Sequence, residues 1–378
     1  MRVAIVAVVV VVVVVVEAEM LLKSIYKMLK PEEKQNFRRG LVLQWHITDK
    51  CNLRCSHCYQ STYNNNELCF DSLLNILNQY KALLQEWKNK NGYQSKGHIT
   101  ITGGEPFVRT DFLDLLEIFA RDRSEYTFSI LTNGGFIDNK IADKLQELRP
   151  SYVQVSLDGT KNTHDKIRGV GAFDAVISSI KLLRKKRLRT LISFTAHQSN
   201  YHEFTDVAYL GIKLGVSRIW VDRLIPCGSG SILKSLDTGQ TQELFSAMNV
   251  MRQKAKDSWF GSTEIAMHRA LQFLHTGGKP YSCSAGDTLI TIMPNGDLYP
   301  CRRMPVNSGN VMRTPLAELY ENNPLFQRLR DHQKISEGCH SCCYARLCRG
   351  GLKCLSHAIF GDAFKADPAC WLVDKKPG

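Results

Sequence analysis

Apolar and polar positions alternate along the chain in a repeating series of short runs that begins near Leu41. Runs rich in β-branched residues predict strands, and the segments between them, with apolar residues three and four apart, predict helices. The expected strands are 41–48, 97–103, 126–132, 152–158, 189–197 and 217–224, and the expected helices are 70–88, 111–120, 139–148, 173–186, 201–214 and 242–255. Strands that alternate with helices predict parallel β/α units.

Connections in such units are right-handed, so the sheet either stays open or curls into a barrel. No Gly-x-Gly-x-x-Gly follows the first strand, which weakens a dinucleotide-binding fold. The unusual polar residues and cysteines gather directly after the strands. The carboxyl ends of parallel strands meet at one edge, where α/β proteins place their sites. We therefore expect an α/β fold with a partial (β/α)6 barrel of TIM type and a site at that edge.

Composition narrows the class of protein only slightly. The chain has 378 residues, a hydrophobic fraction of 44% and a net charge of +13. Excess positive charge favours an acidic peptide, a nucleotide or a nucleic acid as partner, but a solvated basic surface explains it equally well. The 13 cysteines are many for a chain too long to be a small disulfide scaffold. Their close spacing favours metal binding.

The N-terminal residues 1–40 stand apart from this pattern. The valine-rich run at 3–16 is shorter than the ~20 residues of a spanning helix and is followed by Glu17 and Glu19. Neither a signal peptide nor a membrane partner is expected. We interpret this segment as an extension with a mis-assigned start, the first residue being Met20 or Met28. The intact mass of the native protein tests that hypothesis.

The stretch "CNLRCSHCY" carries Cys51, Cys55 and Cys58 immediately after the first expected strand. A [4Fe–4S] cluster normally takes four thiolates. Three thiolates leave one iron with a vacant position, by the same logic that leaves catalytic zinc open to a substrate. This spacing alone is only moderately specific for an iron–sulfur cluster, because zinc sites also have short spacings between cysteines.

With "GGEP" after the second strand, the chain resembles the radical S-adenosylmethionine (SAM) enzymes. The resemblance implies a [4Fe–4S] cluster on Cys51, Cys55 and Cys58 that chelates SAM and cleaves it reductively to a 5′-deoxyadenosyl radical. The SAM contacts that the resemblance implies are Tyr59, Gly103, Gly104, Glu105, Asn133, Ser156 and Arg168. Several also have plain structural explanations: Gly103–Gly104 and Asn133–Gly134 as turns, Tyr59 as a core aromatic. The sequence identifies no catalytic residue.

A second set of cysteines occupies the last hundred residues. A hairpin is expected to turn at 294–296 and to end at Cys301. The pattern resembles the SPASM extension, a small cysteine-rich α+β domain with two auxiliary [4Fe–4S] clusters. The resemblance implies one cluster on Cys339, Cys342, Cys348 and Cys370, and another on Cys283, Cys301 and Cys354. Cys354 follows Cys348 two residues later than the family spacing.

The second auxiliary set lacks an evident fourth ligand. Cys227 and Cys343 are candidates, and an iron left open to substrate, which we favour from the sequence, is the alternative. Cys69 is expected to be a small buried hydrophobic residue. The expected domains are the barrel at 41–225, a bridging segment at 226–280 with a flexible "GSGS" at 228–231, and the SPASM domain at 281–378.

From this resemblance we expect oxidative modification of a ribosomally made peptide in an anaerobic cytoplasm, forming a crosslink, thioether or unsaturation. An implied partner is an electron donor such as flavodoxin or ferredoxin. Binding of a leader peptide, if there is one, would use the barrel, the SPASM domain or a separate leader-binding protein. In sulfatase maturases, an Asp that acts as a base follows the cysteine that corresponds to Cys301. Here Arg302 stands at that position, and an arginine cannot act as a base because it stays protonated. A sulfatase is therefore disfavoured as the substrate. The alternatives are an oxidoreductase acting on a small carboxylic acid or a porphyrin precursor, and an iron–sulfur electron-transfer or zinc-structural protein without radical chemistry.

Overall fold

The computed structural model describes residues 40–63, 67–91, 96–257 and 263–373. The expected N-terminal extension and its alternative start residues lie outside these described residues. None of the described helices is long and apolar enough to cross a membrane.

The described strands form a single open sheet. Their bounds are β1 (Val42–His46), β2 (Gly97–Thr102), β3 (Tyr126–Thr132), β4 (Val153–Ser156), β5 (Thr190–Ala196), β6 (Arg218–Arg223), β7 (Glu264–Ile265), β8 (Leu289–Ile292) and β9 (Leu298–Tyr299). The order is β7-β6-β5-β4-β3-β2-β1-β8-β9, and all neighbours are parallel except β8 and β9. The two edges do not pair, so the predicted partial barrel is confirmed.

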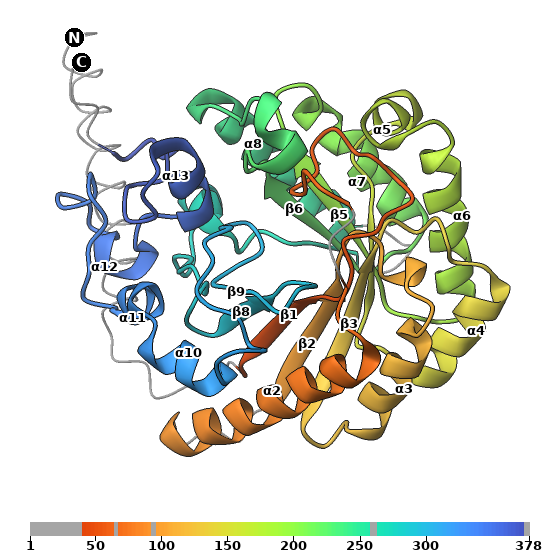
Figure 1. The fold of residues 1–378 in the computed structure, drawn as a ribbon. Helices are drawn as coiled ribbons and strands as arrows, with labels where there is room; N and C mark the ends of the chain where they lie inside the picture. The colour runs from red at the N-terminus through yellow and green to blue at the C-terminus, as the bar shows by residue number, and fades with distance from the viewer. Residues whose placement is uncertain (1–39, 64–66, 92–95, 258–262, 374–378) are drawn as a thin grey trace, which may run out of the picture. The chain divides into compact units, whose positions relative to one another are not determined.

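Helices follow the strands around the outside of this sheet (Figure 1). They are α2 (Phe70–Asn91), α3 (Phe112–Arg121), α4 (Asn139–Leu148), α5 (Lys161–Arg168), α6 (Ala172–Lys185), α7 (Phe204–Lys213) and α8 (Thr238–Lys256). Short 3-10 turns precede or replace helices at η1 (Pro106–Val108), η2 (Tyr201–Glu203), η3 (Gly228–Ile232) and η4 (Ala270–Gln272). Helix α5 was not expected, because only His164 and Ile167 of its eight residues are buried.

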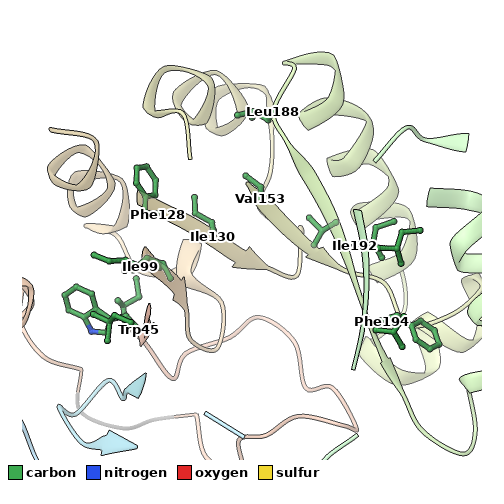
Figure 2. Packing of buried hydrophobic residues seen from close by; sticks show 14 of the residues in the cluster. Trp45, Ile99, Phe128, Ile130, Val153, Leu188, Ile192 and Phe194 are labelled. Atoms are coloured by element: carbon green, nitrogen blue, oxygen red, sulfur yellow. The ribbon is translucent and has the colours of Figure 1, made fainter. Parts of the chain in front are cut away.

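The core lies between the sheet and these helices. Trp45, Ile99, Phe128 and Ile130 project from neighbouring strands, and each is at most 2% exposed (Figure 2). Burial of each such side chain contributes roughly 1.5–3 kcal/mol. The apolar positions that predicted the strands are therefore the positions that hold the helices onto the sheet.

The cysteine-rich C-terminal segment extends the barrel sheet. Strand β8 pairs in parallel with β1, Val42 opposite Leu289, and β9 folds back on β8 as the predicted hairpin. Its helices are α9 (Phe273–Thr276), α10 (Leu316–Asn322), α11 (Pro324–Arg330), α12 (Ala345–Cys348) and α13 (Lys353–Phe360). Leu316 and Tyr320 of α10 belong to the same buried cluster as the barrel strands. The domain boundaries stay a prediction.

The segment after β6, expected to be a flexible bridge, begins as an ordered turn. In η3, the Gly230 N–H donates to the Cys58 carbonyl at 3.0 Å, and the Ser229 N–H donates to the Gln60 carbonyl at 3.1 Å. At Gly228, with φ of 58°, a Cβ atom would lie 2.2 Å from the Tyr59 carbonyl oxygen. Glycine is required here because the two backbones touch.

Candidate active site and cluster sites

A cavity of about 140 Å³ opens at the carboxyl ends of strands β1 to β6. Residues at or near these strand ends line it: His46, Thr102, Thr132, Ser156, Thr195 and Asp222. The three cysteines after β1 also line it, as does Arg302 from the C-terminal segment. The cavity therefore lies at the edge where the sequence predicts the site.

The loop between β1 and α2 presents Cys51, Cys55 and Cys58 as half-buried free thiols. Burial raises the pKa of the Cys55 thiol to about 11, and the Arg168 guanidinium opposes that rise. Because a cluster binds thiolates, metal binding at this loop must displace protons. Three soft sulfur donors on one loop fit an iron–sulfur cluster that keeps one iron free for SAM.

The "GGEP" loop crosses directly over the chain that enters the cysteine loop. The Gly104 N–H donates to the Thr48 carbonyl, and the Glu105 N–H donates to the Lys50 carbonyl, both at 2.8 Å. A Cβ atom on Gly103 would lie 2.4 Å from the Thr48 carbonyl oxygen, and one on Gly104 would lie 2.3 Å from that of Lys50. The two glycines therefore permit a close backbone approach while still lining the cavity.

The Glu105 side chain points into the protein and does not line the cavity. Its carboxylate accepts from the Asn133 N–H at 2.7 Å, from the Thr132 hydroxyl at 2.8 Å and from the Phe107 N–H. Burial raises the pKa of Glu105 to about 7, although these hydrogen bonds oppose the shift. Glu105 ties the glycine loop to the end of β3, and its contact with SAM stays a prediction.

Asp158 is a buried hub; it was expected at the site edge as the last residue of the predicted strand 152–158, but the sequence indicated no role for it. Its carboxylate accepts from Arg168 Nε at 2.6 Å and from the Thr195 N–H at 2.8 Å, and lies 2.8 Å from His57 Nε2. Burial opposes its charge, but Arg168 and His57 hold the pKa of Asp158 below its usual range. His57 stands between Cys55 and Cys58, so this hub positions the cysteine loop. No local signal links these residues, which come from separate segments of the chain.

The remaining predicted SAM contacts, Tyr59, Asn133, Ser156 and Arg168, all line the cavity. Asn133 Nδ2 lies 3.9 Å from the Cys51 sulfur, and Arg168 Nη1 lies 3.8 Å from the Cys55 sulfur. The Arg168 guanidinium is already paired with Asp158, which limits what it offers to a ligand carboxylate. The structure brings the predicted residues together, and their individual roles stay predictions.

The wall of the cavity facing the C-terminal segment carries His46, Asp222 and Arg302. His46 is buried with neither ring nitrogen hydrogen-bonded to the described residues. Burial, followed by the nearby Arg302, lowers the pKa of His46 to about 3, so its ring is neutral near pH 7. Asp222 forms ion pairs with Arg269 at 2.8 Å and Arg303 at 2.9 Å. Asp222 was expected at this edge because it lies near the end of the predicted strand 217–224, but no local pattern predicts that His46 and Arg302 converge with it.

One C-terminal pocket collects the first predicted auxiliary set. Cys339, Cys342, Cys348 and Cys370 all line it, as does Asp367. Asp367 forms a buried double hydrogen bond with Arg223 at the end of β6, at 2.5 and 3.0 Å. This pair attaches the cysteine pocket to the barrel, and four thiols around one pocket fit a fully ligated cluster.

The second auxiliary set of cysteines lies in a separate group of buried hydrophobic residues. Cys301 and Cys354 are buried within this group, and Cys283 and Cys227 are partly buried and pack against it. Burial, and then the neighbouring Cys354 thiol, raise the pKa of Cys227 to about 11. Cys343 is exposed, with Cys342 as its neighbouring thiol. Packing therefore favours Cys227 over Cys343 as a fourth ligand.

Cys69 lies outside both sets and corrects an expectation. It is exposed beside the Ser72 hydroxyl at 3.3 Å, because it precedes α2 rather than lying on the buried face of that helix. Among the described residues, no three His, Cys, Asp or Glu side chains are grouped to hold a single metal ion.

Comparison with known families gives two matches. The radical SAM superfamily matches residues 45–208, and the iron–sulfur cluster-binding domain SPASM matches residues 283–343. The AdoMet-dependent heme synthase of Methanosarcina barkeri is 26% identical, covering 87% of this chain and 95% of that protein. The mycofactocin maturase MftC of Mycobacterium tuberculosis is 28% identical, covering 86% of this chain and 82% of that protein.

Solved structures confirm the fold. SuiB of Streptococcus suis bound to SAM has a TM-score of 0.69 and 21% identity, covering 89% of this chain and 78% of that chain. The structure of anSMEcpe with AdoMet and the Cp18Cys peptide has a TM-score of 0.69 and 20% identity, covering 87% of this chain and 93% of that chain.

The cavity, the cysteine sets and the family matches all indicate the same cofactors. The first part of the chain binds a [4Fe–4S] cluster and SAM, and the C-terminal part binds auxiliary iron–sulfur clusters. This chain therefore contains a radical SAM domain and a C-terminal SPASM domain, and it is an enzyme.

Proposed function

We propose that this enzyme oxidatively modifies a ribosomally synthesised peptide, leaving a crosslink, a thioether or an unsaturation. The SAM bound at the front cluster supplies a 5′-deoxyadenosyl radical, which removes a hydrogen atom from an unactivated carbon. The observation that carries the proposal is the composition of the cavity wall. Cys51, Cys55 and Cys58 line one side, and Arg302, next to Cys301, lines the other. A group entering the cavity therefore meets both the radical source and the auxiliary-cluster segment.

In this proposal the protein holds and shields the reactants. Cys51, Cys55 and Cys58 bind the front cluster, and Asp158 fixes their loop through His57 and Arg168. The backbone of the glycine loop, with Tyr59, Asn133 and Ser156, surrounds SAM. The C-terminal cysteines would hold the auxiliary clusters, which would supply an acceptor for the second electron or a binding position for substrate. Flavodoxin or ferredoxin supplies the first electron, in an anaerobic cytoplasm that keeps the thiols reduced.

Relatives support a peptide substrate. SuiB has been solved bound to the precursor peptide SuiA, and anSMEcpe has been solved with the Cp18Cys peptide. The relative MftC is named as a maturase. If the peptide carries a leader, the leader binds to the barrel, to the SPASM domain or to a separate protein.

A second candidate substrate is a porphyrin precursor or another small carboxylic acid. Three relatives at 24–26% identity are named AdoMet-dependent heme synthase, Fe-coproporphyrin III synthase and pre-heme d1 synthase. Arg269, Arg302 and Arg303, at or beside the cavity, suit an acidic small molecule and an acidic peptide equally well.

The test is an anaerobic assay of reconstituted enzyme with SAM and a reductant. Peptides encoded by short reading frames beside the gene form one arm, and iron coproporphyrin III forms the other. We expect a peptide to stimulate 5′-deoxyadenosine formation. Mass spectrometry should show that the same peptide has lost two hydrogen atoms. Loss of carbon dioxide from the porphyrin, with every peptide unchanged, would transfer the assignment to the second candidate.

A further inference from the structure

The cavity carries more positive charge on its C-terminal wall than the protein itself neutralises. Asp222, the one carboxylate among the described residues that line the cavity, pairs with Arg269 and Arg303, while Arg302 lines the cavity as an additional cation. We propose that Arg302 binds a carboxylate group of the substrate, with His46 as a second donor beside it. This inference rests on the proposed function, because it concerns the substrate of the same cavity.

Arg302 differs from its two neighbours in having no carboxylate partner. Asp222 is already engaged by Arg269 and Arg303, and among the described residues no ion pair forms at Arg302. Its guanidinium lies over the Tyr59 ring at 5.6 Å and lines the cavity. A half-buried cation without a counter-charge is unfavourable, so a ligand anion at this position is stabilised.

His46 gives an independent reason to place a ligand here. It ends β1, is 5% exposed, and lines the cavity with both ring nitrogens unpartnered among the described residues. Buried polar groups are nearly always hydrogen-bonded, so an unpartnered ring facing a cavity indicates a bound group. A neutral imidazole offers one N–H donor, and the planar guanidinium offers a fork that matches the two oxygens of a carboxylate.

A carboxylate fits this pair better than an amide or a hydroxyl group. Only an anion both neutralises Arg302 and accepts hydrogen bonds from two donors. The carboxylate has two sources within the proposed chemistry: an acidic side chain or C-terminus of a peptide, or a propionate of a tetrapyrrole. The competing explanation is that Arg302 offsets the negative charge of a cluster bound at Cys301, its neighbour in sequence.

The experiment measures binding to reconstituted, SAM-loaded holoenzyme. One probe is a pair of soluble random octapeptide libraries, one with a free C-terminus and with Asp and Glu included, the other with an amidated C-terminus and with Asn and Gln in place of Asp and Glu; peptides are recovered on immobilised enzyme and read by mass spectrometry. The other probe is coproporphyrin III and its tetramethyl ester, read by fluorescence quenching. We expect wild type to favour the carboxylate forms by about tenfold to a hundredfold, the range for a charge-assisted hydrogen bond. Arg302→Gln should lose this preference, and Arg302→Lys should keep part of it.

Arg313→Gln, which removes an exposed arginine, is the matched control and should keep the full preference. A preference for coproporphyrin III alone would uphold the carboxylate site and overturn the peptide assignment. Wild type without a preference for carboxylate over amide or ester would overturn the inference, whether or not the variants fold. An unchanged preference in Arg302→Gln, with altered iron content, SAM affinity or electron paramagnetic resonance spectrum, would assign Arg302 to the cofactors instead.

Discussion

The barrel cavity and the C-terminal cysteine region both present cysteines that bind iron–sulfur clusters, but different structural elements hold those cysteines in place. In the barrel, parallel strands hold the cysteine loop, Asp158 fixes that loop through His57, and Glu105 ties the neighbouring glycine loop to the end of β3. The region from 333 to 373 contains the short helices α12 and α13 and one isolated β-bridge between Glu337 and Lys365, and the rest is turns and irregular chain. We infer that the barrel site is shaped by packing before any cluster binds, whereas the C-terminal region depends on its clusters for order.

Removing the front thiols gives the largest expected effect. The triple replacement of Cys51, Cys55 and Cys58 by Ala should abolish 5′-deoxyadenosine formation and leave the C-terminal clusters bound, because the two sets use separate segments. Chromatography of the reaction and iron analysis of the protein measure both parts. Wild-type rates of 5′-deoxyadenosine formation in the triple variant would refute the assignment of the front site.

Asp158→Asn tests whether the barrel site is shaped by its buried hub. The change leaves Arg168 and His57 without their anionic partner, and breaking such a buried pair costs about 3–5 kcal/mol. We expect a lower urea midpoint and at least tenfold slower SAM cleavage. The control is Asp174→Asn, whose carboxylate is 70% exposed, with little change expected. Equal stability of the two variants would show that the hub does not hold the loop.

Cys227→Ala tests whether the barrel supplies a ligand to a C-terminal iron–sulfur cluster. Cys227 follows a barrel strand but packs against the buried hydrophobic group that contains Cys301 and Cys354. If Cys227 is the fourth ligand, the variant should alter or lose one auxiliary cluster in its electron paramagnetic resonance spectrum while the front cluster remains. Cys343→Ala is the matched control, because its thiol is exposed. An unchanged spectrum in Cys227→Ala would favour the open iron.

The smallest expected effect concerns the pH dependence of the barrel. The pKa of Glu105 is about 7 in the folded protein against 4.5 for the unperturbed group. Because the folded pKa is raised, Glu105 contributes stability that is present below pH 4.5 and is lost as the pH rises through 7. Urea unfolding of Glu105→Gln should show a shallower loss of stability over this interval than wild type. Parallel pH profiles for the two proteins would contradict the shift.

The sequence predicted the six barrel strands and their helices because each is a local pattern of apolar positions. It did not predict α5, which has almost no apolar face, nor the pairing of β8 with β1, which joins segments about 250 residues apart. The cysteine sets were visible because their spacing is local. The Asp158 hub and the convergence of His46 with Arg302 were not visible, since they depend on which strand ends become neighbours.

The most direct test of the two-region account is the metal content of the anaerobically reconstituted protein. Three cysteine sets that each hold a [4Fe–4S] cluster predict up to about twelve irons per chain, and the triple variant of the front set should retain about eight. Mössbauer spectroscopy, iron analysis and zinc analysis of both proteins give these numbers. Iron near four per chain in the wild type, or one zinc per chain bound at the C-terminal cysteines, would contradict the account.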